Sequence, residues 1–155
     1  MKLLCISDTH GETKKLQRII KSVDEIDILL HAGDYIRDVD SINQHEFKVF
    51  SVKGNCDRGT NGKFKKVIGI NDKKLLLVHG HQYGIKYGLH KLSYQVAEVE
   101  ADIVVFGHTH RSLCLKENGI LYFNPGSVTY PRDGSASYGI IEIEGDKIES
   151  RIEKI

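Results

Sequence analysis

Residues 2 to 11 read KLLCISDTHG, a short apolar run that ends in polar residues and a glycine. The run Lys2–Ser7 is short, apolar and bounded by polar residues, which predicts a buried strand. Apolar residues then recur at helical spacing over Thr13–Glu25, which predicts an amphipathic helix. Asp27–His31 (DILLH) predicts a second buried strand. A strand, a helix and a strand in this order indicate a βαβ unit and a largely parallel sheet.

The rest of the chain adds further strands, one more helix and three hairpins. Phe47–Val52 and Ile103–Phe106 predict core strands, and Leu89, Leu92, Val96 and Val99 mark an amphipathic helix. Turn residues Asn71-Asp72, Asn118-Gly119 and Gly145-Asp146 each join two strand-like runs, which predicts antiparallel hairpins. Parallel pairing early and hairpins late predict a mixed α/β fold with two sheets. Because no linker or repeat interrupts the pattern, we expect a single domain over residues 1–155.

Composition places the chain among ordinary globular proteins. Of its 155 residues 40% are hydrophobic and 28% charged, and the formal net charge is +1. A charge so close to zero gives no strong signal for nucleic acid or for an anionic membrane as the main partner. The three cysteines are widely spaced, which indicates neither a disulfide framework nor a CxxC zinc site. With no signal peptide and no apolar run near the ~18 residues that span a bilayer, we expect a cytoplasmic protein.

Polar side chains follow five of the predicted strands at the point where each strand ends. The five endings are Ser7-Asp8-Thr9-His10-Gly11, His31-Ala32-Gly33-Asp34, Gly54-Asn55-Cys56-Asp57, His79-Gly80-His81 and Gly107-His108-Thr109-His110. Ligands of open α/β sheets bind at the carboxyl ends of strands. Each ending alone has an ordinary interpretation, such as a turn, a helix cap or a structural histidine. Their recurrence on five strands favours a shared site.

The residue types at these endings suit a metal centre. In extended chain, residues two apart point to the same side, so Asp8 with His10, and His108 with His110, are expected to act as pincers. Gly33, Gly54, Gly80 and Gly107 keep the backbone bare where close approach is needed. Mixed nitrogen and oxygen ligands suit Mn²⁺, Fe²⁺, Co²⁺, Ni²⁺ or Zn²⁺ better than Ca²⁺. Together the endings offer two carboxylates, one carboxamide and up to four histidines. Seven ligands are too many for one small cation and about right for two. His45 and His90 lie outside the pattern and are expected at the surface.

The ordered set D-x-H, G-D, G-N-x-D, H-G-H and G-H-T-H resembles the calcineurin-like metallophosphoesterase superfamily. More narrowly, the chain resembles the small single-domain phosphodiesterases of the YfcE type, which are related to a retromer scaffold subunit. The resemblance covers nearly the whole chain and includes Asn124 to Ser127 (NPGS). It implies a four-layer α/β/β/α sandwich of two mixed sheets flanked by helices.

The resemblance also implies the metal ligands and the reaction. One cation would take Asp8, His10, Asp34 and His110, and the second would take Asp34, Asn55, His79 and His108, with Asp34 and a hydroxide bridging the pair. Mn²⁺ is the first choice for both cations; Ni²⁺, Co²⁺, Fe²⁺, Zn²⁺ and Mg²⁺ are the alternatives. The implied activity is phosphodiester hydrolysis in which Asp34, Asn55 and His108 take part. The alternatives are a phosphomonoesterase and a protein-binding scaffold like the retromer subunit.

Cys56 departs from the superfamily pattern. Many members have a histidine at this position, followed by Asp or Glu, and that histidine protonates the leaving oxygen. A thiol is a weak donor whose ordinary pKa of ~8.5 leaves it mostly neutral at pH 7. We therefore expect hydrolysis to favour good leaving groups, unless Cys56 is only a small filler with no catalytic role.

The remaining expectations concern the substrate and partners. Arg58 and Arg132 are candidates for binding the substrate phosphate, although either could be a solvated loop arginine. Asn124 either hydrogen-bonds near the metals or forms the NPGS turn, and His31 and His81 are interpreted as structural. The substrate is expected to be a small phosphoester. The superfamily resemblance also suggests a homodimer or a higher homo-oligomer.

Overall fold

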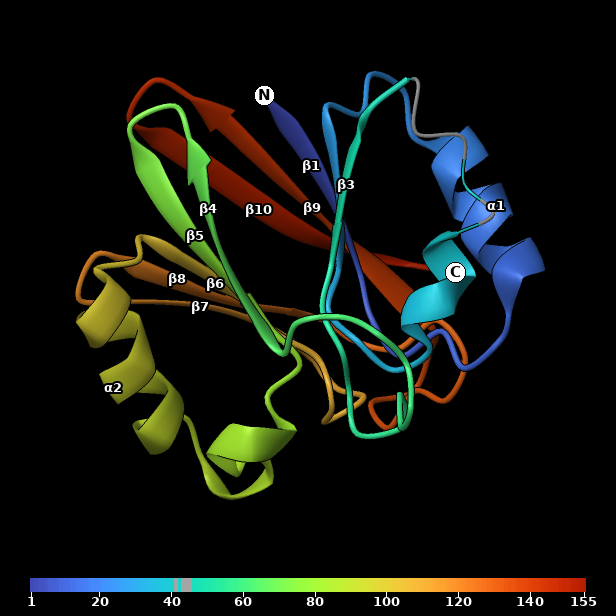
Figure 1. Cartoon of the computed structure of the whole chain (residues 1–155). Coiled ribbons are helices and arrows are strands. Elements are labelled where there is room, and N and C mark those ends of the chain that lie inside the picture. Colours follow the sequence, from blue (N-terminus) through green and yellow to red (C-terminus); the bar gives the residue numbers. More distant parts are fainter. Residues whose placement is uncertain (41, 43–45) are drawn as a thin grey trace.

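The protein forms two mixed sheets with helices on their outer faces (Figure 1). The structure is a computed structural model that describes residues 1–40, 42 and 46–155. In the described part of the chain, the first sheet has the strand order β10-β9-β1-β2-β3. Its strands are β1 (Lys2–Ile6), β2 (Ile28–His31), β3 (Lys48–Ser51), β9 (Ser137–Glu144) and β10 (Lys147–Lys154). β1, β2 and β3 run parallel and β9 pairs antiparallel with β1, which confirms the expected mixture.

The second sheet has the order β4-β5-β6-β8-β7. Its strands are β4 (Lys65–Ile70), β5 (Lys73–Val78), β6 (Ile103–Val105), β7 (Ser112–Glu117) and β8 (Ile120–Pro125). β5, β6 and β8 are parallel, while β4 and β7 are antiparallel edge strands. All three predicted hairpins, β4–β5, β7–β8 and β9–β10, are present.

Two α-helices and three short 3₁₀ turns complete the described elements. They are α1 (Thr13–Ser22), α2 (His90–Val99), η1 (Ile36–Val39), η2 (His81–Tyr83) and η3 (Ile85–Tyr87). The prediction that the first helix extends to Glu25 was wrong, because Val23 has extended backbone with φ −109° and ψ 117°. No helix in the described residues is long and apolar enough to cross a membrane. His90 is exposed as expected, and His45 lies outside the described residues.

Three apolar layers hold the sandwich together and confirm the four-layer fold. Leu3, Leu30, Leu75 and Val105 belong to the central layer, which both sheets share. Leu16 and Ile19 of α1 pack on the outer face of the first sheet, and Leu92 and Val96 of α2 on that of the second. Each fully buried aliphatic side chain of this kind contributes about 1.5–3 kcal/mol. Burying both faces of the inner strands explains why they read as continuous apolar runs.

The sandwich brings the loops after β1, β2, β5 and β6 to one edge. Within the first sheet, the backbone N–H of Asp8 donates to the carbonyl of Gly33 at 3.0 Å. Within the second, the N–H of Gly107 donates to the carbonyl of His79 at 3.0 Å. Nδ1 of His79 lies 2.7 Å from the carbonyl oxygen of Ala32, which joins the two sheets at this edge. The fold therefore places the chemistry-bearing loops side by side.

Candidate metal centre

The structure places all seven predicted ligand residues at this shared edge. Four of them, Asp8, His10, Asp34 and His110, form a cluster in which one ligand atom from each lies within 4.8 Å of the others. Oδ1 of Asp8 is 3.0 Å from Nε2 of His110, and Oδ2 of Asp34 is 3.7 Å from Nε2 of His10. This is the set that the superfamily resemblance assigned to one cation.

The other predicted ligands lie around His79. Its Nε2 is 3.2 Å from Oδ1 of Asn55 and 3.4 Å from Oδ1 of Asp34. The ring of His108 packs edge-on against the ring of His79, with centroids 5.1 Å apart. Asp34 thus faces both groups, with Oδ2 toward His10 and Oδ1 toward His79.

Two buried atoms in the first cluster have no hydrogen-bond partner: Oδ1 of Asp8 and Nε2 of His10. Oδ1 of Asp8 lies near His110 but without hydrogen-bond geometry, whereas Oδ2 accepts from the Ser7 hydroxyl at 2.6 Å. An unpartnered buried polar atom costs about 1–3 kcal/mol. A cation bound between these atoms would remove that cost, so the residues fit a metal.

Hydrogen bonds fix the ring orientation of two histidines. Nδ1 of His79 lies 2.7 Å from the carbonyl of Ala32, and Nδ1 of His110 lies 2.7 Å from the carbonyl of Tyr130. A carbonyl oxygen can only accept, so each Nδ1 carries the hydrogen. In the neutral ring, Nε2 then has its lone pair available for a metal, which is the usual arrangement of a histidine ligand.

Five of the seven residues have left-handed backbone, which differs from the expected geometry. The φ angles of Asp8, His10, Asp34, His108 and His110 lie between 46° and 66°. The expected extended backbone was therefore wrong. Asp8 and His10 still share one cluster, as expected, but His108 lies beside His79 and His110 beside His10, so these two histidines do not act as a pair. Such conformations cost about 1–3 kcal/mol each and gather at functional sites.

In the metal-free centre, the carboxylates and the histidines shift one another's pKa values. Burial alone would raise the pKa of Asp8, but His110 and His79 outweigh it and hold that pKa below its ordinary value. Burial also opposes ionisation of Asp34, whose pKa is lowered by His79 and by the N–H of Cys56. The Asp8 carboxylate raises the pKa of His110 in turn. A bound cation would displace the proton from Nε2 of His110, because a histidine must be neutral to coordinate.

His108 differs because burial, His79 and Lys86 lower its pKa to about 4. It is neutral at pH 7 and needs no deprotonation to act as a ligand.

Two glycines are required because ligand side chains pack against them. A Cβ at Gly54 would collide with the Asp34 carboxylate and lie 2.5 Å from the Asp34 nitrogen. A Cβ at Gly107 would collide with the Ser7 hydroxyl and lie 2.7 Å from Oδ2 of Asp8. The expected close approach is thus confirmed at these two glycines, where Asp34 approaches Gly54, and Asp8 with its partner Ser7 approaches Gly107.

We expect Gly54→Ala to cost about 1–3 kcal/mol of stability through overpacking and to weaken metal binding by displacing Asp34. Gly69→Ala is the matched control, because nothing lies within 4 Å of a Cβ there and its φ is not positive. Thermal unfolding with EDTA and then with Mn²⁺ separates the two effects. Equal behaviour of both variants would show that the Gly54 contact does not position Asp34.

Comparison with known proteins identifies the family. Residues 1–146 match the family model described as the calcineurin-like phosphoesterase superfamily domain. The chain belongs to this superfamily. It is 36% identical over 148 residues to the probable metallophosphoesterase YsnB of Bacillus subtilis, covering 94% of this chain and 86% of that one. It is 28% identical over 169 residues to the phosphodiesterase YfcE of Escherichia coli K12, with 92% and 88% covered.

Solved structures agree with the fold. The crystal structure of a predicted phosphoesterase from Streptococcus pneumoniae TIGR4 has a TM-score of 0.86 and 29% identity, covering 99% of this chain and 88% of that one. Zinc-complexed Vps29 of Entamoeba histolytica has a TM-score of 0.78 at 23% identity, covering 100% and 98%, which shows a likeness of fold alone.

Cys56, where the superfamily resemblance implied a histidine, lies at the exposed rim of the centre. Its backbone N–H donates to Oδ1 of Asp34 at 2.9 Å, and its sulfur accepts from Nδ2 of Asn55 at 3.4 Å. Burial and the neighbouring Asp34 raise the pKa of the thiol to about 11. Cys56 is therefore a neutral thiol that orients the Asn55 amide, with Oδ1 toward His79.

Asp57 is not free to orient a side chain at position 56. Its Oδ1 accepts from the N–H of Ile36 and its Oδ2 from the N–H of Gly54, both at 2.8 Å. The carboxylate thus ties the loop after β3 to η1. This role is invisible in the sequence, where Asp57 reads as a partner for the residue beside it.

The two arginines predicted to bind phosphate occupy different places. Both are exposed; Arg132 lines a cavity next to the centre, whereas Arg58 lies in the turn after Asp57. The N–H of Arg132 donates to the carbonyl of His110 at 2.8 Å, which fixes its backbone beside a ligand candidate.

Several residues that support the centre were missed or left open by the sequence. The Ser7 hydroxyl donates to Asp8, and the Ser127 hydroxyl donates to the Asp8 carbonyl at 3.0 Å. Asn124 donates to the Gly107 carbonyl and to Thr109, and accepts from the N–H of Gly126, so it joins the NPGS and GHTH turns. The sequence marks these residues only by their position beside a motif, and the structure shows that they are buried.

Proposed function

We propose that the protein is a metal-dependent phosphodiesterase with two divalent cations, Mn²⁺ being the first choice. The observation that carries this proposal is the pair of buried, unpartnered atoms, Oδ1 of Asp8 and Nε2 of His10, inside a cluster of four ligand candidates. The superfamily membership and the likeness to a phosphodiesterase support the reaction class.

The residues divide into two overlapping ligand sets. Asp8, His10, Asp34 and His110 would hold one cation, and Asp34, Asn55, His79 and His108 the other. When bound, such a pair supplies positive charge for the phosphate and lowers the pKa of a water molecule. With two divalent ions, four positive charges face the carboxylates of Asp8 and Asp34, so the centre attracts an anionic phosphoester.

The chain's own groups hold this arrangement before any substrate arrives. The carbonyls of Ala32 and Tyr130 keep the rings of His79 and His110 in one orientation, and Ser7 and Cys56 fix the two carboxylates. Ligands fixed in this way need no reorganisation during the reaction, which is the main source of electrostatic catalysis.

The exposed rim favours substrates with good leaving groups. Cys56 is a neutral thiol and Asp57 is occupied by backbone N–H groups, so neither is a strong proton donor for a departing oxygen. We propose that p-nitrophenolate-like leaving groups, which depart without protonation, are preferred.

Two other functions are alternatives to diester hydrolysis. A phosphomonoesterase would use the same ligands and differ only in substrate charge and shape. A protein-binding scaffold would need none of them, and the likeness to Vps29 concerns the fold alone.

The test is hydrolysis by metal-stripped protein of bis-p-nitrophenyl phosphate and p-nitrophenyl phosphate, with Mn²⁺, Ni²⁺, Co²⁺, Zn²⁺ or Mg²⁺ added separately. We expect Mn²⁺ to restore diester hydrolysis, and Asp34→Ala, as a contamination control, to abolish it. Turnover of the monoester alone would overturn the diesterase proposal. No turnover with any metal, despite bound metal, would favour the scaffold.

A further inference from the structure

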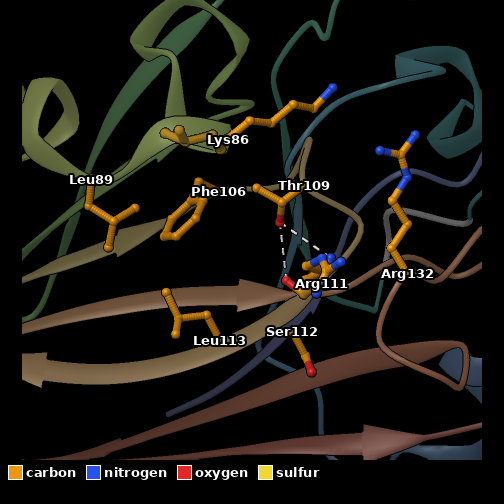
Figure 2. A pocket seen from close by; sticks show the side chains of 9 residues that line it. Lys86, Leu89, Phe106, Thr109, Arg111, Ser112, Leu113 and Arg132 are labelled. Carbon is orange, nitrogen blue, oxygen red and sulfur yellow. Dashed lines mark hydrogen bonds between the residues drawn. The ribbon is translucent and has the colours of Figure 1, made fainter.

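A cavity of about 500 Å³ lies directly beside the candidate metal centre. Thr109, between the ligand candidates His108 and His110, forms part of its wall. Its other walls come from η3, from the end of β6 and from the start of β7 (Figure 2). Cavities of about 300–1,000 Å³ hold small organic ligands, so this one is large enough for a nucleotide-sized group.

Three cationic side chains, Lys86, Arg111 and Arg132, line the cavity, and no acidic residue is among its described lining residues. In the described part of the chain, none of the three has a carboxylate within ion-pair distance. Asp133 follows Arg132 in the chain, but its carboxylate accepts from the N–H and the hydroxyl of Ser112 and lies 3.5 Å from Lys154. The cavity therefore carries uncompensated positive charge, which favours an anion.

Two of the cavity's residues join it to the metal centre. Thr109 stands between the ligand candidates His108 and His110, and the backbone N–H of Arg132 donates to the carbonyl of His110 at 2.8 Å. Hydrogen bonds between Thr109 and the backbone of Arg111, both 3.3 Å, hold the start of β7 against the GHTH turn. A group bound at the cations is thus adjacent to a phosphate bound at the metals.

Besides the cations and the hydroxyls of Thr109 and Ser112, the cavity is lined by apolar side chains. Leu89, Phe106 and Leu113 lie together on one side, and Arg111 and Arg132 lie on the other (Figure 2). Phe106 is buried, and Leu89 and Leu113 are half-buried. A ligand that fills this space needs a flat or apolar part against the leucines and an anionic part against the arginines.

We propose that this cavity is the specificity subsite of the enzyme and that it binds a nucleoside-like group carrying a second phosphate, linked to the phosphodiester that is hydrolysed. The inference rests on the proposed phosphodiesterase function and deepens it by naming the substrate class. The scissile phosphate lies at the metals, the apolar part packs on Leu89, Phe106 and Leu113, and the second phosphate meets Arg111, Arg132 and Lys86.

The test compares two diesters that differ by one phosphate: thymidine 5′-(p-nitrophenyl phosphate) and the same compound with a 3′-phosphate. Charge-assisted hydrogen bonds contribute most when they are bidentate to arginine. We expect wild-type kcat/KM to favour the 3′-phosphorylated compound roughly 10-fold, and the preference to shrink as salt screens the exposed charges. In Arg111→Gln/Arg132→Gln the ratio should fall to about 1. Because the two compounds share one leaving group and one scissile phosphate, any general loss of activity in this variant cancels in the ratio.

Matched variants separate charge from shape. Leu113→Gln should lower kcat/KM for both thymidine compounds without changing the ratio of the two values. Lys116→Gln removes a cation from β7 whose amine donates to the Ile148 carbonyl outside the cavity. It should leave both kcat/KM values unchanged. A ratio near 1 in the wild type, or a ratio unaffected by the double substitution, would overturn the subsite while leaving the phosphodiesterase proposal intact.

Direct binding keeps the inference testable if no diester is hydrolysed. Calorimetric titration of thymidine 3′,5′-bisphosphate and thymidine 5′-monophosphate into Mn²⁺-loaded protein should show roughly 10-fold tighter binding of the bisphosphate, lost in Arg111→Gln/Arg132→Gln. Equal binding of the two nucleotides would reject the subsite. If no diester is hydrolysed but the bisphosphate still binds more tightly, only the proposed enzyme activity is rejected.

Discussion

We expect Asp34→Asn to lower kcat/KM for bis-p-nitrophenyl phosphate by at least about 10³-fold, more than the roughly 10²–10³ that one electrostatic contact contributes. The Asp34 carboxylate faces both ligand groups, with its oxygens 3.7 Å from His10 and 3.4 Å from His79. Removing its charge therefore weakens both cation sites at once. Asparagine keeps an oxygen for the Cys56 N–H and tolerates left-handed backbone at φ 59°, so the fold should persist.

Metal-dependent stability gives this prediction a second readout. A cation at 100 times its Kd stabilises the folded state by about 2.7 kcal/mol. For a chain of this length each kcal/mol shifts Tm by about 2–4 °C, so each site filled by Mn²⁺ should raise wild-type Tm by about 5–11 °C. Asp34→Asn should lose most of that rise, measured against its own Tm in EDTA.

The matched control is Asp102→Asn. The Asp102 carboxylate also accepts a backbone N–H, that of Lys74, at 2.8 Å, but it precedes β6 at the opposite edge of the sheet. Asp102→Asn should leave both the activity and the Mn²⁺-induced rise in Tm unchanged. An Asp34→Asn variant that kept its Mn²⁺-induced rise in Tm would mean that the shared carboxylate is not a ligand.

The sequence predicted the fold well because its signals are local. Apolar runs at Lys2–Ser7 and Asp27–His31 and turn pairs such as Asn118-Gly119 depend on neighbouring residues, and the strands formed where those signals lay. The end of α1 was misplaced because Val23 and Glu25 continue the apolar and charged pattern while their backbone turns away from the helix.

The candidate ligands were also predictable, but their geometry was not. Order along the chain and strand ends sufficed to gather Asp8, His79 and His108, since parallel strands end at one edge. The left-handed backbone of Asp8 and His10 leaves no mark in the sequence, because the same letters are compatible with extended chain. The contribution of Asp57 depends on the N–H of Ile36, 21 residues earlier in the chain, and that of Ser7 depends on the side-chain conformation of Asp8.

The subsite beside the centre could not be found in the sequence for a related reason. Lys86, Arg111 and Arg132 come from three separate segments of the chain, and each alone resembles a solvated surface residue. Only the packing of η3 and β7 beside the GHTH turn places their charges in a single cavity.

We expect Cys56→His to raise kcat/KM for diphenyl phosphate, a poor leaving-group substrate, by about 10²-fold, at the low end of the 10²–10⁴ that general acid catalysis contributes. The gain is modest because both carboxylate oxygens of Asp57 already accept backbone N–H groups, so no partner orients the new imidazole. Bis-p-nitrophenyl phosphate should change little, since its leaving group departs without protonation. An imidazole acts as an acid only while protonated, so the gain should be largest below its ordinary pKa of ~6.5 and decline above it.

The control for Cys56→His is Cys56→Asn, which places a polar side chain at the rim that cannot donate a proton to a leaving oxygen. Both variants remove the sulfur that accepts from Nδ2 of Asn55, so any loss from a displaced Asn55 should be the same in both and equal for the two substrates. The acid contribution is then the difference between the variants in the ratio of diphenyl to bis-p-nitrophenyl hydrolysis. If Cys56→His and Cys56→Asn change both substrates equally, the thiol position has no part in leaving-group protonation, and Cys56 serves only to orient Asn55 toward His79.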